Sequence, residues 1–525
     1  MLGAGTRRDR AEGRGRYAAE EPPLRSELFS ADEMERHGKR LGLEHVLAPG
    51  HAPDRLLARL ADNERVLTEV CGLLAVAVTA ERRITPAAEW LLDNFHLVEE
   101  QIRTAKRHLP KGYSRELPRL AHARHGARPR VYHLASDAIS HGDGRVDAES
   151  LSRFVAAYQT VKPLRLGELW AIPIMLRLAL IENLRRVGAR IAAGALDRNR
   201  AAAWADQMMD VALRDPKSLI LVIADMARSN PPMVSPFVAE LARRLQGQGA
   251  ALALPLTWIE QRLSESGLSI EQLVQSEAQE QAGDQVSIGN TIGSLRFLGA
   301  MDWREFVETM SLVERKLRED PDRTYGAMDF LTRDRYRHAI EEIAKRSPLQ
   351  ESEVAREAIL LASSAGSAGP AAGERAAHVG YYLVGAGRPR LEEAVGARPS
   401  VSRALHRLAG RMPLAVYLGA IAIASFAATA ALLAHARLGA SPALLIGVGA
   451  VVLLATSQAA VGMVNWLATL FVTPHALPRM DFSQAIPPQC RTLVAVPTLL
   501  ESAEGTAALV ESLEVRFLAN RDDHV

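Results

Sequence analysis

The sequence contains very little cysteine and few aromatic residues. Only Cys71 and Cys490 occur in 525 residues, and they lie far apart. This spacing excludes a disulfide framework and a cysteine-rich zinc site, and it suits a reducing cytoplasm. Aromatic residues make up 5% of the chain, while alanine, leucine and arginine are abundant. Because strands favour aromatic and β-branched side chains, this composition predicts a mainly α protein.

The chain also lacks an excess of charge of either sign and an apolar leader. Its 63 basic and 61 acidic residues leave a net charge of +2. No basic face is visible, so the sequence predicts no nucleic-acid partner. The first 25 residues carry several arginines but no apolar core, which excludes a secretory signal. We expect residues 1–28 to be disordered.

Helix-start signals recur through residues 29–362 and predict a large helical cytoplasmic region. Ser30 and Ser269 each begin a capping-box pattern, with Glu or Gln three residues later. Thr85 precedes a proline at the first helical position, and Asp147 is an N-cap candidate. No regular repeat is visible, so a solenoid of fixed period is not predicted.

Apolar spacing indicates where several of these helices bury a face. After Thr85, one face carries Leu91, Phe95, Val98, Ile102 and Ala105. The stretch 169–181 is strongly apolar but too short to cross a bilayer, so we expect a buried helix that continues to Arg186. Further helices are predicted at 302–318 and at 332–346, the second started by Thr332.

Two long uncharged stretches near the end of the chain predict a transmembrane hairpin. Residues 412–434 carry no charge, and residues 443–472 form a second apolar stretch after a short turn. Each is long enough to cross a hydrocarbon core of roughly 30 Å at ~1.5 Å per residue. Two such runs in tandem are rare inside globular domains.

The basic residues around the hairpin predict its orientation. Arginines are frequent before the first stretch and follow the second at Arg479 and Arg491, whereas the turn carries only His435 and Arg437. Because cytoplasmic flanks are enriched in arginine and lysine, both ends of the chain are expected in the cytoplasm. The predicted location is the bacterial inner membrane, with more than one span.

The segment after the hairpin changes character. Residues 491–498 form a short β-rich run that proline stops, and residues 506–518 have a helical pattern. These are expected to be the first strand and helix of an α/β domain that is incomplete in this chain. The predicted organisation is 1–28 disordered, 29–362 helical, 363–411 a flexible arginine-rich junction, 412–434 and 443–472 transmembrane, and 488–525 the start of an α/β domain.

Residues suited to catalysis or metal binding are sparse. His133 and His141 flank Asp137, with Asp143 nearby, which allows a metal site, although a turn followed by an N-cap is favoured because the segment lacks the alternating carboxylates of a calcium loop. His96 is expected to be a packing residue. The residues alone therefore predict no catalytic or metal-binding residue.

Two other patterns are given structural interpretations. Residues 289–293 (GNTIG) only loosely resemble a phosphate-binding loop and are interpreted as a helix-start turn. The dense Arg/Glu pattern of 332–346 is interpreted as a solvated helix face with spaced ion pairs.

Several longer stretches resemble one family. The sequence is similar to the N-terminal part of the bacterial cyclic β-1,2-glucan synthases over roughly residues 30–525. The matching stretches are 89–101, 111–113, 167–186, 328–337, 378–383, 496–500 and 513–522.

The resemblance implies an inner-membrane glycosyltransferase that polymerises glucose from UDP-glucose, with a divalent metal (Mg²⁺ or Mn²⁺) in the complete enzyme. The segment 488–525 would begin the transferase domain, with Pro497, Thr498 and Glu501 as nucleotide-sugar-binding candidates. The catalytic residues are expected beyond this chain, which would be inactive alone and bind no metal. The implied partners are UDP-glucose, glucan and the lipid bilayer.

Two other classes of function remain open at this point. One is a membrane-anchored helical scaffold or signalling protein without catalysis. The other is transport, which is weaker because neither span carries an intramembrane charge. The sequence indicates neither the oligomeric state nor the role of the helical region.

Overall fold

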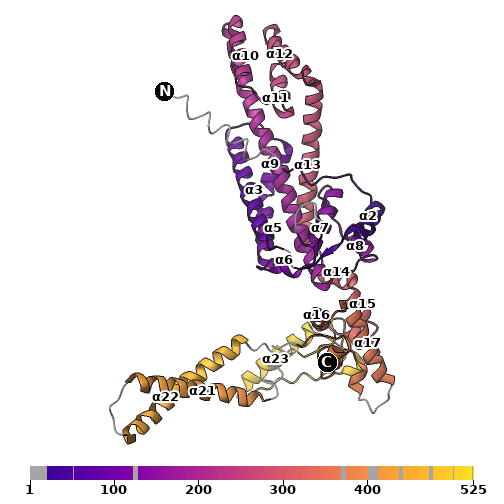
Figure 1. Cartoon of the computed structure of the whole chain (residues 1–525), viewed down its shortest axis with the longest axis vertical. Helices are drawn as coiled ribbons and strands as arrows, with labels where there is room; N and C mark the ends of the chain where they lie inside the picture. Colours follow the sequence, from indigo (N-terminus) through magenta and orange to yellow (C-terminus); the bar gives the residue numbers. More distant parts are fainter. Residues whose placement is uncertain are drawn as a thin grey trace. The chain divides into compact units, whose positions relative to one another are not determined.

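The computed structural model describes residues 21–50, 53–121, 128–367, 374–399, 412–436, 442–471, 477–499, 502–522 and 524. The chain divides into two compact units, Met1–Ser311 and Leu312–Val525. This boundary falls inside the range 29–362, where the sequence carries no boundary signal. Figure 1 shows the helices of both units. The mainly α fold predicted from composition is confirmed.

The first unit is built almost entirely from helices. They are α2 (Ala31–Glu44), α3 (Leu56–Thr79), α4 (Pro86–Asp93), α5 (Phe95–His108), α6 (Tyr113–Glu116), α7 (Arg130–His141), α8 (Ala148–Gln159), α9 (Leu166–Arg214), α10 (Leu219–Arg228), α11 (Ser235–Leu245), α12 (Ala253–Ser264), α13 (Ile270–Ala300) and α14 (Trp303–Met310). Two short strands, β1 (Leu47–Ala48) and β2 (Arg119–Leu120), pair antiparallel.

Helix α9 organises this unit. Its 49 residues span about 75 Å at ~1.5 Å per residue. It packs against α3, α5, α7, α11 and α13, and Figure 1 shows it alongside α13. The first half is buried on nearly every side because helices surround it. The buried helix predicted at 169–181 is therefore confirmed, but it continues to Arg214 rather than ending near Arg186.

Local capping signals predicted the helix starts well. Ser30 and Ser269 form complete capping boxes. Thr85 accepts a hydrogen bond from the backbone of Ala88, and Asp147 accepts one from the backbone of Ser150. Each cap joins residues three positions apart, so neighbouring sequence alone determines it.

Three expectations within the first unit and at its end are wrong. Residues 289–293 lie in the middle of α13, because tertiary contacts on the flanking turns sustain a helix through both glycines. The helix expected at 302–318 is broken between α14 and α15 (Leu312–Leu317), at the boundary of the two units. The apolar face after Thr85 is interrupted at Asn94, and Phe95 is only half-buried, although the other four members are buried.

The second unit contains a smaller helical core and the apolar hairpin. Its helices are α15, α16 (Phe330–Ala344), α17 (Glu351–Ser367), α18 (Gly380–Leu383), α19 (Arg388–Ala394), α21 (Pro413–Ala436), α22 (Pro442–Phe471) and α23 (Ala503–Ala519). Helices α15 to α19 enclose a core that includes Leu317, Ile340 and Val379. Helix α16 is capped by Asp329, three residues before the predicted start at Thr332.

The junction predicted at 363–411 is only partly described. Helix α17 reaches Ser367 and α19 covers Arg388–Ala394. Residues 368–373 and 400–411 lie outside the described residues, as do residues 1–20 of the N-terminal segment expected to be disordered. Residues 21–28 do make contacts, since the backbone amide of Leu24 donates to Asn183 Oδ1 at 3.0 Å.

The hairpin forms as two long apolar helices, α21 and α22, that pack against each other. Both are long and apolar enough to cross a membrane, over Pro413–His435 and Leu444–Leu470. Only 11% and 6% of their most apolar windows are buried inside the protein. A core helix of a soluble domain would be mostly buried, so the exposed apolar surface fits a membrane protein.

The strand predicted after the hairpin is not formed. Residues 491–499 have no strand and are exposed, whereas α23 forms where a helix was predicted. A strand becomes stable only beside a neighbouring strand, and no strand in the described part of the second unit offers an edge to these residues. The start of an α/β domain is therefore not confirmed.

Candidate functional site

The nucleotide-sugar-binding candidates do not form a site in this structure. Pro497 and Thr498 are exposed and lie in the segment without regular structure. Glu501 lies outside the described residues. Both side chains are exposed to solvent, so the described residues do not gather around them as a binding pocket would.

The hairpin carries polar contacts between its two helices. Thr429 Oγ1 and Thr456 Oγ1 are 2.8 Å apart, and the hydroxyl of Tyr417 donates to Asn465 Oδ1 at 2.7 Å. Thr429 is buried although its neighbours along α21 are mostly exposed. Polar side chains in an apolar environment gain from pairing across helices, so these contacts fix which faces of α21 and α22 meet.

The chain that follows α22 returns to the helical core of the second unit. The backbone amide of Asp329 donates to the carbonyl of Arg479 at 2.9 Å, and the amide of Asp481 donates to the carbonyl of Ala327 at 2.8 Å. The amide of Arg479 also donates to Thr332 Oγ1 at 3.0 Å. Residues 479–481 are thus attached to the turn that starts α16.

A buried charge network lies beneath the start of α16. The carboxylate of Glu314 is 2.6 Å from the guanidinium of Arg337 and accepts a hydrogen bond from the hydroxyl of Tyr325 at 2.5 Å. The side chain of Arg337 is completely buried. Burial and the charge of Glu314 raise the pKa of Tyr325, which keeps the phenol protonated. The solvated face predicted for 332–346 is therefore wrong at Arg337, because α15 covers that side of α16.

A second set of polar groups connects the stretches 328–337 and 378–383. Asp320 accepts hydrogen bonds from the backbone amide of Val379 at 2.9 Å and from His378 Nδ1 at 2.7 Å. His378 Nε2 lies 3.5 Å from the hydroxyl of Tyr336. The order carboxylate, imidazole, hydroxyl is that of a nucleophile triad. Tyr336 is buried in the core, however, and burial raises its pKa, so we assign these contacts to packing.

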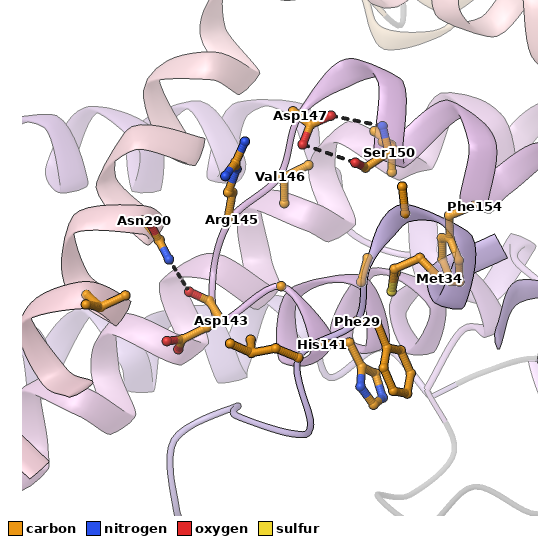
Figure 2. A pocket seen from close by; sticks show the side chains of 16 residues that line it. Phe29, Met34, His141, Asp143, Arg145, Val146, Asp147, Ser150, Phe154 and Asn290 are labelled. Carbon is orange, nitrogen blue, oxygen red and sulfur yellow. Dashed lines mark hydrogen bonds between the residues drawn. The ribbon is translucent and has the colours of Figure 1, made fainter. Parts of the chain in front are cut away.

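A cavity of about 430 Å³ opens in the first unit between α2, the turn from α7 to α8, and α13. Figure 2 shows the lining residues, among them Phe29 and Met34 on one side and Asn290 on the other. The turn that closes it needs left-handed backbone at Asp143 and Gly144. A Cβ at Gly144 would lie 2.3 Å from Thr291 Oγ1, so only glycine fits there.

This turn is attached to the middle of α13. Asn290 Nδ2 donates to the carbonyl of Asp143 at 3.2 Å (Figure 2), and Ser294 Oγ donates to the carbonyl of Gly144 at 2.8 Å. The carboxylate of Asp143 pairs with Arg25 at 2.6 Å. The sequence favoured a turn followed by an N-cap here, and the structure confirms it. Within residues 289–293, Asn290 stabilises this turn through its hydrogen bond to Asp143.

Beside this cavity the structure brings together His37, Asp137 and His141. Their nitrogen and carboxylate oxygen atoms all lie within 4.8 Å of one another. Asp137 and His141 are one turn apart on α7, and His37 comes from α2. The sequence places His133, His141 and Asp143 near Asp137, but His133 and Asp143 are not in this group. His37 was missed because it lies 100 positions away and carries no local signal.

Comparison with known proteins supports the resemblance found in the sequence. The chain is 34% identical over 511 residues to the cyclic beta-(1,2)-glucan synthase NdvB of Rhizobium meliloti (strain 1021). The alignment covers 95% of this chain and 17% of that protein, so the chain spans about one sixth of its relative's length. No family model matches the chain. The chain is therefore similar, along almost all of its length, to an N-terminal part of a cyclic β-1,2-glucan synthase.

Proposed function

We propose that this chain is the membrane-anchoring, N-terminal portion of a glycosyltransferase that polymerises glucose from UDP-glucose into cyclic β-1,2-glucan. The observation that carries the proposal is the 34% identity to a glucan synthase along 95% of the chain. The catalytic residues, and the Mg²⁺ or Mn²⁺ ion that would neutralise the leaving diphosphate, are assigned to parts of the enzyme outside these 525 residues.

The hairpin would anchor the enzyme in the bacterial inner membrane. The 24 residues of α21 extend about 36 Å, enough to cross a hydrocarbon core of roughly 30 Å. The 30 residues of α22 extend about 45 Å, so this helix would cross at a tilt or continue into the interface. Trp466, near its end and exposed, suits the interface with the headgroups.

Two independent features support placing both flanks of the hairpin on the same side of the membrane. The first is the arginine content of the flanks. The second is the set of hydrogen bonds between residues 479–481 and residues 327–332, which come after and before the hairpin. Chain segments that bond to each other must share one compartment. With UDP-glucose made inside the cell, that compartment would be the cytoplasm.

In this arrangement the segment after α22 would lead into the transferase domain. Pro497, Thr498 and Glu501 follow the attached residues 479–481 and would lie on the cytoplasmic side, where a nucleotide sugar could reach them. Their role in binding UDP-glucose remains part of the proposal. The attachment to α16 would set the distance between that domain and the membrane.

A non-catalytic scaffold is the second candidate function. It is favoured by the polar networks around Glu314 and Asp320, which are buried rather than open to a substrate. The two functions differ in what the complete protein does with UDP-glucose, so one assay separates them.

The enzymatic proposal is tested with membranes that contain the complete protein. We expect them to convert radiolabelled UDP-glucose into cyclic β-1,2-glucan, and we expect membranes with residues 1–525 alone to make none. Absence of glucan with the complete, membrane-inserted protein would refute the enzyme and leave the scaffold. Synthesis by residues 1–525 alone would refute the placement of the catalytic residues.

The topology is tested with the exposed thiol of Cys490, which follows the second span. A membrane-impermeant maleimide should label it in inside-out vesicles and not in intact spheroplasts. Cys490→Ser is the matched control, since the remaining Cys71 is buried. Labelling of Cys490 in intact spheroplasts would show that the orientation is wrong.

A further inference from the structure

The cluster of His37, Asp137 and His141 in the first unit has the composition of a metal site. Two imidazoles and one carboxylate are the ligands that zinc and similar divalent ions take from proteins. Asp137 and His141 share one face of α7 because residues four apart on a helix are neighbours. His37 faces them from α2. The three side chains therefore converge from two helices that are distant in sequence.

His37 is buried and has an unsatisfied nitrogen in this cluster. Its side chain is 8% exposed, and no hydrogen-bond partner is present for its Nε2. The nearest acid is Asp137, whose Oδ1 lies 3.9 Å away. A buried polar atom without a partner is costly, and an ion held between the two groups would remove that cost.

His141 already has its ring oriented as a ligand would. Its Nδ1 lies 2.7 Å from the carbonyl oxygen of Glu27. A carbonyl only accepts, so Nδ1 carries a proton and Nε2 is the nitrogen left for an ion. The ring also stacks on Phe29 with centroids 4.0 Å apart, as Figure 2 shows. A backbone carbonyl on the second nitrogen is the usual support of a metal-binding histidine.

Arg40 determines the tautomer of His37 before an ion binds. Its guanidinium lies 2.7 Å from His37 Nδ1 and can only donate, so the proton of the ring is on Nε2. An ion that binds Nε2 must displace this proton to Nδ1 and move Arg40 away. The ligand atoms must also approach one another from separations of up to 4.8 Å to about 3.3 Å, the spacing in a tetrahedral site with bonds of ~2.0 Å.

We propose that His37, Asp137 and His141 bind one divalent transition-metal ion of the zinc class, which cross-links α2 to α7. The remaining coordination positions are taken by water. Mg²⁺ is disfavoured because it prefers oxygen ligands. This site is separate from the metal expected for glycosyl transfer and does not depend on the proposed function.

The test uses the full chain, purified in detergent, freed of affinity tags and stripped with a chelator. Isothermal titration with ZnCl₂ should show one ion per chain. His37→Gln, Asp137→Asn and His141→Gln should each weaken binding at least ~tenfold. His133→Gln is the matched control, because His133 lies on α7 one turn before Asp137 and outside the cluster. It should bind zinc like the wild type.

Circular dichroism will show whether each variant is folded. Asp137→Asn is the decisive variant, since its side chain is one-third exposed and asparagine has nearly the same shape as aspartate. Bound Co²⁺ should also give the visible absorption of a nitrogen- and oxygen-ligated ion in the wild type and in His133→Gln, and not in the three ligand variants. The proposal is overturned if the stripped wild type binds no zinc in a 1:1 ratio. It is equally overturned if Asp137→Asn binds zinc as tightly as His133→Gln.

Discussion

Replacing Glu168 by glutamine would test how the first unit tolerates an unbalanced buried charge. Glu168 and Arg130 form an ion pair whose side chains are 0% and 1% exposed. Arg130 Nε donates to Glu168 Oε1 at 2.8 Å, and the second guanidinium nitrogen donates to the other carboxylate oxygen. The carboxylate also accepts from the backbone amide of Arg165 at 3.0 Å, which starts α9.

The size of the effect follows from what glutamine preserves and removes. Its amide oxygen can still accept from Arg165, so the cap of α9 survives. The negative charge is lost, and Arg130 stays buried with neutral partners such as the carbonyl of Pro163 at 3.1 Å and the side chain of Tyr158. Breaking one side of a buried ion pair costs about 3–5 kcal/mol. For a unit of this size we expect the melting temperature to fall by roughly 10 °C.

The assay is thermal and urea unfolding of the full chain in detergent, followed by tryptophan fluorescence. Five of the six tryptophans lie in residues 1–311, so the signal reports mainly this unit. Glu100→Gln is the control, since Glu100 is exposed on α5 and its loss should change the unfolding free energy by less than ~0.5 kcal/mol.

The reasoning can be refuted by a double variant. Arg130→Met with Glu168→Met removes both charges, and replacing a whole buried pair by apolar residues is often neutral. The double variant should therefore be more stable than Glu168→Gln. A double variant less stable than the single one, or a cost of Glu168→Gln below ~1 kcal/mol, would show that the buried charge does not decide stability here.

The remaining predictions concern pH, the hairpin and the metal site. Burial lowers the pKa of His37 and of His45 to about 4, so the unfolded chain binds protons before the folded one, and stability should fall by roughly 2–5 kcal/mol between pH 6.5 and 4. Unfolding in urea at several pH values checks this, and a flat profile would contradict it. The double variant Thr429→Val with Thr456→Val should weaken the association of α21 with α22 by only ~0.6 kcal/mol. Steric trapping in bicelles measures this free energy, and a loss above ~2 kcal/mol would show that the variant removes more than one hydrogen bond. Arg40→Met should tighten zinc binding severalfold in calorimetry, because it removes the donor that holds His37 in the wrong tautomer, and weaker binding would argue against that role.

Much of the local structure could be predicted from the sequence because its causes are local. The caps at Ser30, Asp147 and Ser269 join a side chain to a backbone amide three residues away, and the structure contains all three. The two apolar helices follow from the length and uniform apolarity of their segments. No distant residue is needed for either inference.

Other features could not be predicted because distant residues determine them. The strand expected at 491–498 has high local strand propensity, but it finds no neighbouring strand among the described residues. Helix α9 continues beyond Arg186 because α10 and α11 cover its second half. The sequence pattern of α16 predicts a solvated helix face. Arg337 on that helix is nevertheless buried, because Glu314 of α15 supplies the opposite charge.

The candidate metal site also combines a feature that local sequence predicts with one that distant residues determine. The sequence by itself determined that Asp137 and His141 share a face of α7, since a spacing of four places them one turn apart. Only the tertiary structure decided that their third neighbour is His37 and not His133, because the packing of α2 against α7 and α8 brings in a residue 100 positions away. Helical periodicity acts over a few residues, whereas the burial that positions His37 depends on the whole unit.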